Sequence, residues 1–494
     1  MKKLFVKILL FIVAFAIITS PLSLLLIKGH QQEPVYTKTY YAALVDKVNL
    51  LEKHKNDKKI ILVGGSNVAF GFDSKYLENI FPEYKVINFG LYAALGTKIM
   101  VDLTKDYINT GDMIFVIPET STQSMSLYFN ASNTLKAIED NPSIYHKLDS
   151  DNKKEIIGEY YNFVKERAKY TEEIVPSGVY KRTNFNENGD ISYLETDKFG
   201  VLLRSQNRMG EIHYDPSTLV DHNFEISDEF AQYLNKYNSY AKNKGANVYY
   251  SFSPVNELSL IQSNDDLENS IIKLYSSLKN KLELLIVGNP REYIIDPHYF
   301  FDSNFHLNDN GAKLRTQIFA KNIYRDVLNK PVSFEVELID KPEYPKIDIN
   351  GEDSVSAKYF DFLDNGTSYS ILSIKNDYKE LKEIVLPTVY NQKPVLGIEK
   401  EAFKGSLLEK IIIPSIGLNN YFKNGCFDGC DNLVSIYLEE VNPDLINVSY
   451  TGELFSDSAA AQITIFVPSE SITLYSTNYF WGAYSKMLEG YKND

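Results

Sequence analysis

The sequence predicts an α/β protein, with a mainly parallel sheet covered by helices on both faces, followed by a smaller domain built from repeats. Short apolar runs alternate with helical patterns through the first part of the chain, which is typical of a parallel sheet. Strand-like segments recur at intervals of 27 and 25 residues from Ile384 to Ile411 to Ile436, as in stacked repeats. The 494 residues, of which 44% are hydrophobic, are enough for two cores.

The N-terminal segment predicts a membrane anchor. An almost continuous apolar run extends from Ile8 to Ile27, with lysines on both sides. About 20 such residues can cross the hydrocarbon core as a helix. The lysines before the run predict a cytoplasmic N-terminus, so a signal-anchor helix within residues 1–30 would place the rest of the chain on the outer side. Cleavage near Ala16 is the alternative, and it would release a secreted protein.

Composition excludes several function classes. The net charge of −14 and the pI near 5.2 argue against nucleic acid as a partner, because phosphate binding needs clustered Lys and Arg. The two cysteines, Cys426 and Cys430, form neither a disulfide framework nor a set of metal-ligand spacings. We therefore expect no metal and no cofactor.

Residues 40–330 are expected to form the α/β domain. A helical pattern over residues 41–55 leads into an apolar run at 59–63, which predicts a strand buried on both faces. Further strands are predicted at residues 85–89, 112–117, 247–252 and 284–287. The alternation stops between about 134 and 232, where a polar helix at 152–167 and Asn-, Gly- and Tyr-rich sequence predict an insertion or cap that shapes a site.

The first chemical motif follows the first predicted strand, where Gly64, Gly65 and Ser66 form a small-residue turn into a helix. Such a turn leaves the serine hydroxyl at the carboxyl edge of the sheet, beside the N–H groups of the helix start. That location suits a nucleophile. A serine that only caps the helix would have the same local sequence.

The second motif lies near the end of the domain. His306 precedes a helical pattern that reaches about Leu328, and Asp302 lies four residues before His306. A histidine and a carboxylate in this arrangement can supply a general base and the group that orients its ring. Together with Ser66 they predict a catalytic triad. We interpret His298 as a loop residue.

These motifs resemble the SGNH/GDSL hydrolase-like superfamily over about residues 58–328. The resemblance rests on the Gly65-Ser66 turn, Asn88-Phe-Gly90, and the Asp302 to His306 segment with Asn308 and Gly311. It implies an SGNH-type, flavodoxin-like sheet with Ser66 as nucleophile, His306 as base and Asp302 as the orienting acid. The chain is more similar to the branch that includes DltD-like D-alanylation and polysaccharide O-acetyltransferase-like proteins, because of the stretches 112–119 and 184–190.

The sequence also departs from that family's pattern. The family has an aspartate before the nucleophile and an asparagine that helps bind the oxyanion, whereas this chain has Gly65 and Glu119 at those places. A carboxylate cannot stabilise developing negative charge unless it is protonated. The expected oxyanion donors are therefore Ser66 and Gly90 N–H, with Asn67 as a third candidate. Glu119 is instead expected to contact the substrate.

Two further expectations concern the insertion and the acid. In the insertion, Asn184 and Asp190 are expected to contact the substrate. The family's acid stands three residues before the histidine, where this chain has Ser303. If Ser303 or a backbone carbonyl oriented His306, the site would be a Ser-His dyad.

The C-terminal repeats, residues 354–494, follow a proline-containing linker at 331–353. They resemble BspA-like leucine-rich repeats, which implies a small solenoid. Its role would be to bind glycan or protein along its sheet, or to serve as a structural appendage. Because the last histidine of the chain is His306, removal of residues from about 351 onward is expected to leave hydrolysis of a small ester nearly unchanged.

The function expected from these features is that of a membrane-anchored, extracytoplasmic serine acyltransferase or esterase of the bacterial cell envelope. The acceptor would be an envelope polysaccharide or a teichoic-acid-like polymer that receives an O-acyl or D-alanyl group, and a membrane-bound O-acyltransferase would be the partner. The alternative is a noncatalytic envelope protein, or a surface adhesin that uses the leucine-rich repeats.

Overall fold

The computed structural model describes residues 33–170, 172–176, 178–194, 202, 204, 225–257, 264–341, 353–366, 368–416, 420–448, 454–455, 463–478 and 480–492. The expected membrane anchor, residues 8–27, lies outside these ranges. Among the helices that are described, none is both long enough and apolar enough to span a bilayer.

The N-terminal part is an α/β unit with a five-stranded parallel sheet in the order β2-β1-β3-β4-β6. Its strands are β1 (Lys59–Gly64), β2 (Lys85–Gly90), β3 (Met113–Ile117), β4 (Asn247–Tyr250) and β6 (Leu285–Ile286). This order is a doubly wound arrangement, in which the strands are added on one side of β1 and then on the other. In such sheets ligands bind at the carboxyl ends of the strands, at the point where the order changes, here between β1 and β3. All five predicted strands are confirmed, within a few residues at their ends.

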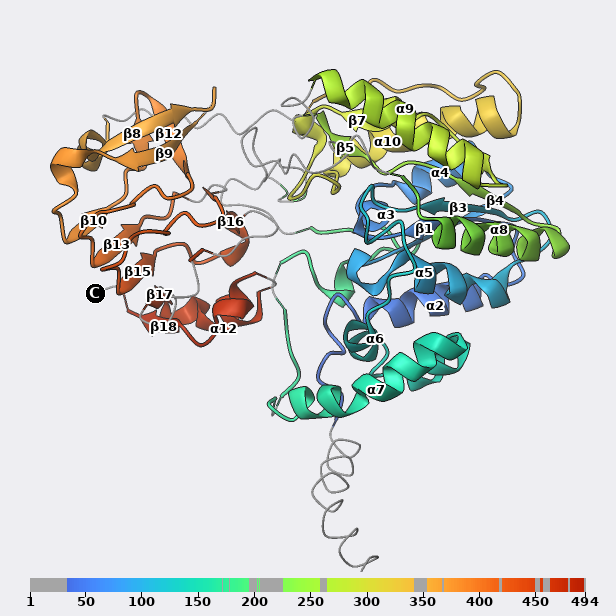
Figure 1. Cartoon of the computed structure of the whole chain (residues 1–494), viewed down its shortest axis with the longest axis horizontal. Coiled ribbons are helices and arrows are strands. Elements are labelled where there is room, and N and C mark those ends of the chain that lie inside the picture. Colours follow the sequence, from blue (N-terminus) through green and yellow to red (C-terminus); the bar gives the residue numbers. More distant parts are fainter. Residues whose placement is uncertain are drawn as a thin grey trace, which may run out of the picture.

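Helices cover both faces of this sheet (Figure 1). On one face, α4 (Ser74–Ile80) and α10 (Asp309–Asn322) pack on Ile60 and Leu62 of β1. On the other face, Ile61 and Val63 of the same strand pack on a second group of helices: α2 (Ala43–Lys53), α5 (Thr97–Thr104) and α8 (Asp228–Asn243). The predicted burial of β1 on both faces is thus confirmed, since every residue of this strand is buried. The unit also contains α3 (Ser66–Ala69), α9 (Asn264–Lys281) and the short pair β5 (Val255–Asn256) and β7 (Ile294–Ile295).

The segment between β3 and β4 forms the predicted insertion. It contains α6 (Ala131–Ala137) and α7 (Ser150–Arg167), and it then returns to the edge strand β2. There the Asn88 N–H donates to the Asn188 carbonyl at 2.8 Å, and the Asn188 side chain donates to the Val86 carbonyl at 2.9 Å. The insertion therefore covers an edge that would otherwise present unpaired backbone groups.

The C-terminal part is a coil in which the chain alternates between two sheets. One sheet contains β8 (Phe360–Asp364), β9 (Tyr369–Ile374), β12 (Lys393–Ile398), β14 (Asn420–Phe422) and β16 (Ile446–Val448), and the short β11 (Val389–Tyr390) pairs with β12. The other contains β10 (Glu383–Val385), β13 (Lys410–Ile413), β15 (Ser435–Leu438), β17 (Thr464–Pro468) and β18 (Leu488–Tyr491), while α12 (Ile472–Thr477) packs near the end. Pairs between successive coils are parallel.

A ladder of aromatic rings forms the centre of this coil. Phe403, Phe427 and Phe455 stack with centroids 5.6 Å apart at each step. Cys426 and Cys430 are buried beside them as free thiols. The repeat seen in the sequence thus corresponds to one turn of the coil. Each turn contributes one ring to the ladder and buries its apolar residues against the next turn.

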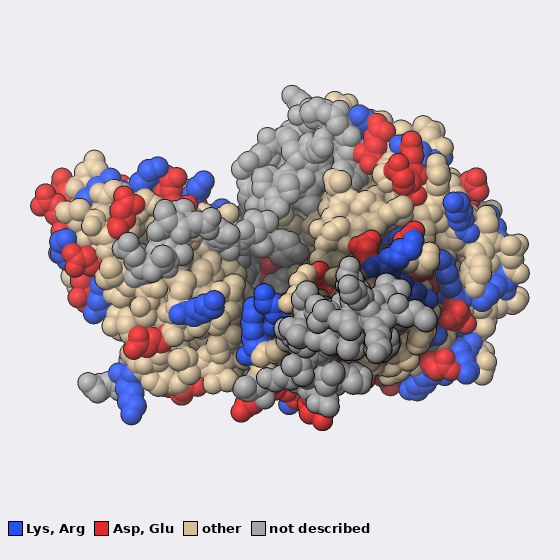
Figure 2. Space-filling view, turned by 60° about the horizontal axis from the view of Figure 1, so that its bottom comes forward, with Lys and Arg blue, Asp and Glu red and all other residues tan. Residues whose placement is uncertain are grey.

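The two parts lie side by side (Figure 1) and make direct contact. Asp444 of the coil accepts a hydrogen bond from the Tyr193 hydroxyl at 3.0 Å, and Leu445 belongs to the hydrophobic core of the α/β unit. Lys and Arg side chains are mixed with Asp and Glu on the face shown in Figure 2, over both parts.

Candidate active site

Ser66 lies directly beyond the carboxyl end of β1, as the first residue of α3. Two glycines allow the close approach of backbone that this turn requires. A Cβ atom on Gly64 would lie 2.4 Å from the Ile117 carbonyl oxygen, and one on Gly90 would lie 2.5 Å from the Ala69 nitrogen. Gly64 therefore lets β1 and β3 approach closely at their carboxyl ends, and Gly90 lets α3 pack against the end of β2, at the edge where doubly wound proteins bind their ligands.

The structure brings the three residues of the expected triad together. Ser66 Oγ lies 2.7 Å from His306 Nε2, and His306 Nδ1 lies 2.6 Å from Asp302 Oδ1. Both distances are those of good hydrogen bonds. His306 precedes α10, whose first turn is capped by Asn308, with the Gly311 N–H donating to Asn308 Oδ1 at 2.9 Å. The cap fixes the backbone beside the imidazole.

Asp302, and not Ser303, contacts the histidine ring. The Ser303 hydroxyl accepts hydrogen bonds from the N–H groups of Phe305 and His306, at 3.2 and 3.1 Å. These two bonds close a tight turn between Asp302 and His306, and the turn brings the two side chains into contact. The acid therefore reaches the histidine although it lies four residues before it, one residue farther than in the family's pattern.

Two residues that the sequence did not point to hold the triad in place. The Phe70 ring stacks on the imidazole of His306, with centroids 4.1 Å apart and planes within 8°. The Tyr180 hydroxyl donates to Asp302 Oδ2 at 2.8 Å. Phe70 follows α3, and Tyr180 comes from the insertion. The sequence offered only a weak signal for Tyr180, namely the Tyr-rich composition of its segment.

His298, the other histidine near this region of the sequence, forms a separate pair. Its Nδ1 lies 2.7 Å from Asp296 Oδ1, and its carbonyl accepts from the Asn308 side chain at 2.7 Å. His298 thus supports the loop before α10.

The three residues expected to bind the oxyanion differ in their present hydrogen-bond partners. The Gly90 N–H donates to Asn88 Oδ1 at 3.0 Å. The Asn67 side chain donates to the Ile117 carbonyl at 3.0 Å, and the Asn67 N–H lies 3.4 Å from Glu119 Oε1. The N–H groups of two of the three expected donors, Gly90 and Asn67, are therefore engaged within the protein. Gly90 donates to the Asn88 side chain, and Asn67 donates towards Glu119. Among the described residues, no hydrogen-bond acceptor is found for the Ser66 N–H.

Glu119 follows β3 and reaches the nucleophile. Its Oε1 lies 3.1 Å from Ser66 Oγ, and only 6% of the residue is exposed. Burial raises the pKa of this carboxyl, although the nearby His306 and the contacts with Ser66 and Asn67 oppose the shift. The sequence placed Glu119 at the site as a contact to substrate. The contact that the structure gives it is to the Ser66 hydroxyl.

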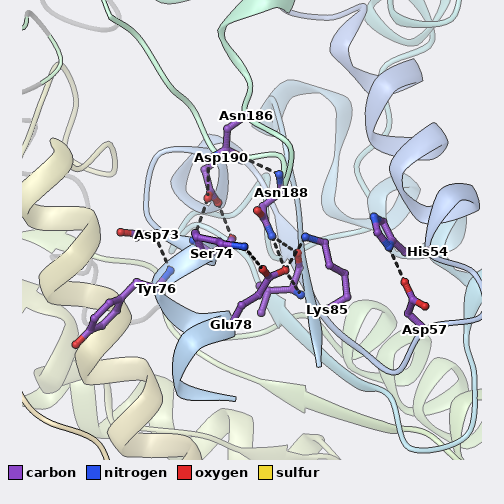
Figure 3. Close-up of polar contacts among 12 residues, drawn as sticks. His54, Asp57, Asp73, Ser74, Tyr76, Glu78, Lys85, Asn186, Asn188 and Asp190 are labelled. Atoms are coloured by element: carbon purple, nitrogen blue, oxygen red, sulfur yellow. Dashed lines mark hydrogen bonds and ion pairs between the residues drawn. The ribbon is translucent and has the colours of Figure 1, made fainter. Parts of the chain in front are cut away.

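Asn184 and Asp190, also expected to contact substrate, are used within the insertion. The Asn184 amide donates to the carbonyls of Gly178 and Val179, at 2.9 and 3.0 Å. Asp190 is buried, and Figure 3 shows its carboxylate directed at Ser74 at the start of α4. A role in substrate binding stays a prediction for both residues, but this geometry favours a structural one, because their polar atoms already have partners.

The buried network around Asp190 joins the insertion to the sheet. Its carboxylate accepts from the Ser74 N–H and hydroxyl, from the Asn88 amide and from the Asn186 amide, at 2.9, 2.6, 2.7 and 3.2 Å. Burial raises the pKa of the Asp190 carboxyl, and these hydrogen bonds counteract the shift. Asn88 thus connects the network to Gly90, at the rim of the site.

Within the described part of the chain, no cluster of three or more His, Cys, Asp or Glu residues is arranged to hold a metal ion. Neither the models of known protein families nor the curated proteins gave a significant match to this sequence.

Proposed function

We propose that this protein is a serine acyltransferase or esterase of SGNH type that acts on a cell-envelope glycan. The observation that supports this proposal best is the continuous chain of hydrogen bonds from Ser66 through His306 to Asp302, at the carboxyl edge of a parallel sheet. A serine beside a base that is oriented by a carboxylate is the arrangement that activates a hydroxyl for attack on an acyl group.

The proposed reaction has two halves. In the first, Ser66 Oγ attacks the carbonyl carbon of an ester, His306 Nε2 takes the serine proton, and the alcohol leaves with that proton. In the second, water or a glycan hydroxyl gives a proton to Nε2 and attacks the acyl-serine, the bond between the acyl carbon and Ser66 Oγ breaks, and Nε2 returns the proton to Oγ. Asp302 keeps Nδ1 protonated throughout and stabilises the imidazolium that forms.

The choice between transfer and hydrolysis depends on which hydroxyl reaches the acyl-serine. We favour transfer to an envelope polysaccharide or teichoic-acid-like polymer, with the acyl group delivered by a membrane-bound O-acyltransferase. This preference rests on the resemblance described above and on the expected anchor at residues 8–27. The C-terminal coil, as a BspA-like leucine-rich-repeat domain, would then bind the polymer.

Trapping of the acyl-enzyme tests the proposal. Full-length protein in detergent is mixed with p-nitrophenyl acetate, quenched in acid and digested for mass spectrometry. We expect an acetyl group on Ser66, none in Ser66→Ala, and none in His306→Ala with its fold intact. An unmodified Ser66 in the wild type, together with no release of nitrophenol, would rule out serine catalysis.

A noncatalytic binding protein is the second candidate. It is favoured by the engagement of the Gly90 and Asn67 N–H groups, which leaves few donors for an oxyanion. The trapping experiment separates the two candidates, because a binding scaffold leaves Ser66 unmodified.

A further inference from the structure

We propose that Glu119 acts as a neutral carboxylic acid, which donates a hydrogen bond to Ser66 Oγ at rest and to the oxyanion during acyl transfer. The inference rests on the proposed serine chemistry and goes beyond it, because it assigns a fourth catalytic residue. It also makes the ionisation of Glu119 a switch that turns the site off.

The inference follows from counting protons at the serine. The hydroxyl of Ser66 has one proton and two close neighbours, His306 Nε2 at 2.7 Å and Glu119 Oε1 at 3.1 Å. His306 Nδ1 faces the Asp302 carboxylate, so Nδ1 carries a proton and a neutral ring must accept at Nε2. The serine proton is then used for Nε2. The contact between Ser66 Oγ and Glu119 Oε1 is a hydrogen bond only if Glu119 supplies the proton.

An ionised Glu119 would require a different arrangement. The carboxylate would accept the serine proton, and His306 would have to donate from Nε2 to remain bonded to Ser66 Oγ. The ring would then carry protons on both nitrogens, and an imidazolium cannot act as a base. The two protonation states of Glu119 thus correspond to a competent and an incompetent triad.

The surroundings of Glu119 favour the neutral form. Within the described residues, no Lys or Arg nitrogen lies within 4.0 Å of its carboxyl. Arg315 on α10 also contacts the segment beside Ser66, but its guanidinium donates to the carbonyls of Asn67 and Phe252, at 2.6 and 3.0 Å. His306 is the charged or titratable group that faces Glu119 from the loop before α10, and Asp302 lies behind it. A buried carboxylate without a fixed cation is costly, so it is held protonated instead.

Glu119 also has the position that an oxyanion donor needs. The carboxyl contacts Ser66 Oγ and the Asn67 N–H at one oxygen, so it lies beside the atom that would attack and beside the first turn of α3. When Oγ bonds to the carbonyl carbon, the π electrons move to the carbonyl oxygen, and the Glu119 O–H donates to that oxygen. On collapse the electrons return, the bond to the alcohol breaks, and the alcohol takes its proton from His306 Nε2. Glu119 keeps its proton throughout, so the step balances.

The test compares Glu119→Gln with Glu119→Ala. A glutamine amide donates as the acid does but does not titrate, whereas alanine donates nothing. On p-nitrophenyl acetate we expect Glu119→Gln to stay within about tenfold of the wild type and Glu119→Ala to lose about 10²- to 10³-fold in kcat/KM. The wild-type rate should fall as the pH rises through the pKa of Glu119, and Glu119→Gln should lack this decline. Glu83→Gln, which removes an exposed carboxylate, is the matched control and should follow the wild type.

A second readout does not depend on turnover. The infrared difference spectrum between the wild type and Glu119→Gln in D₂O should contain the C=O stretch of a protonated carboxyl, which disappears at the pH where the rate declines. Absence of this band at every pH that supports catalysis would overturn the inference and leave the triad intact. A decline in rate that persists in Glu119→Gln would overturn it as well. If the wild type neither turns over esters nor reacts at Ser66 with a fluorophosphonate, the proposed function fails, and the infrared band alone decides the protonation of Glu119.

Discussion

The Tyr180 hydroxyl lies 2.8 Å from Asp302 Oδ2, across a sequence separation of 122 residues. This hydrogen bond joins the insertion to the acid of the triad. Because His306 Nδ1 is bonded to the other carboxylate oxygen, Tyr180 and His306 together fix the carboxylate plane. The insertion therefore contributes to the geometry of the site as well as covering the edge strand.

Tyr180→Phe tests this contribution. The variant keeps the ring and removes one hydrogen bond to a carboxylate, so we expect kcat/KM for a small ester to fall about tenfold, equivalent to about 1.4 kcal/mol. The thermal midpoint should change little. Tyr240→Phe is the control, because its hydroxyl donates to the Lys105 carbonyl at the surface, and it should retain the wild-type rate. Equal rates for all three proteins would show that Asp302 needs no second partner.

Asp302→Asn should be far more damaging to turnover. An asparagine amide would donate to Nδ1, so the imidazole would carry its proton on Nε2 and could not accept from Ser66. We expect a loss of about 10³- to 10⁴-fold in kcat with an unchanged circular dichroism spectrum.

Ser303→Ala removes only the acceptor for two backbone N–H groups, and it should lower stability by about 1 kcal/mol with a small effect on rate. If the two variants exchanged these effects, Ser303 would be the orienting residue.

Asp190→Ala should affect stability more than catalysis. It leaves the donors of Ser74, Asn88 and Asn186 without their buried acceptor, so we expect the free energy of unfolding to fall by about 3 kcal/mol. Urea titration followed by circular dichroism measures this change. Glu187→Ala, at a neighbouring exposed position, should change stability little. A stable Asp190→Ala variant with weaker substrate binding would restore the original assignment of Asp190 to the substrate.

Asp444→Ala tests how the coil is attached. Asp444 accepts from the Tyr193 hydroxyl and the Asn478 amide, at 3.0 and 2.9 Å. The variant leaves two buried donors without their acceptor, so we expect the thermal midpoint to fall while hydrolysis of a small ester stays nearly unchanged. Deletion of residues from 351 onward should behave in the same way. A loss of rate as large as that of Tyr180→Phe would instead show that the coil, which touches the insertion, completes the active site.

The elements that were predictable are those whose signal is local. The apolar run in β1 and the glycines around Ser66 are adjacent in the sequence, and they specify a buried strand and a close-packed turn without reference to the rest of the chain. The pairing of Ser66 with His306 was also predictable, because the order of strands and helices brings both to the same edge of the sheet.

The parts that were not predictable depend on contacts between distant segments. Nothing near Tyr180 in the sequence indicates that its hydroxyl meets Asp302. Asp190 was expected to contact the substrate, and only the placement of the insertion on β2 shows its buried partners. The Gly90 N–H was expected to bind the oxyanion, and in the structure it donates to the side chain of Asn88, two residues earlier. Tertiary packing decides which polar atoms form hydrogen bonds with each other. The pattern of apolar runs in the sequence carries no information about these partners.

The stacking of Phe70 on His306 has a kinetic consequence. A ring stacked at a centroid distance of 4.1 Å is held in one orientation, so Nε2 faces Ser66 from a single position. In the proposed acyl transfer, the departing alcohol and the incoming acceptor would therefore exchange their protons with Nε2 at the same place, one after the other. An excess of either substrate would then occupy the place of the other, so the proposal predicts ping-pong kinetics with mutual substrate inhibition.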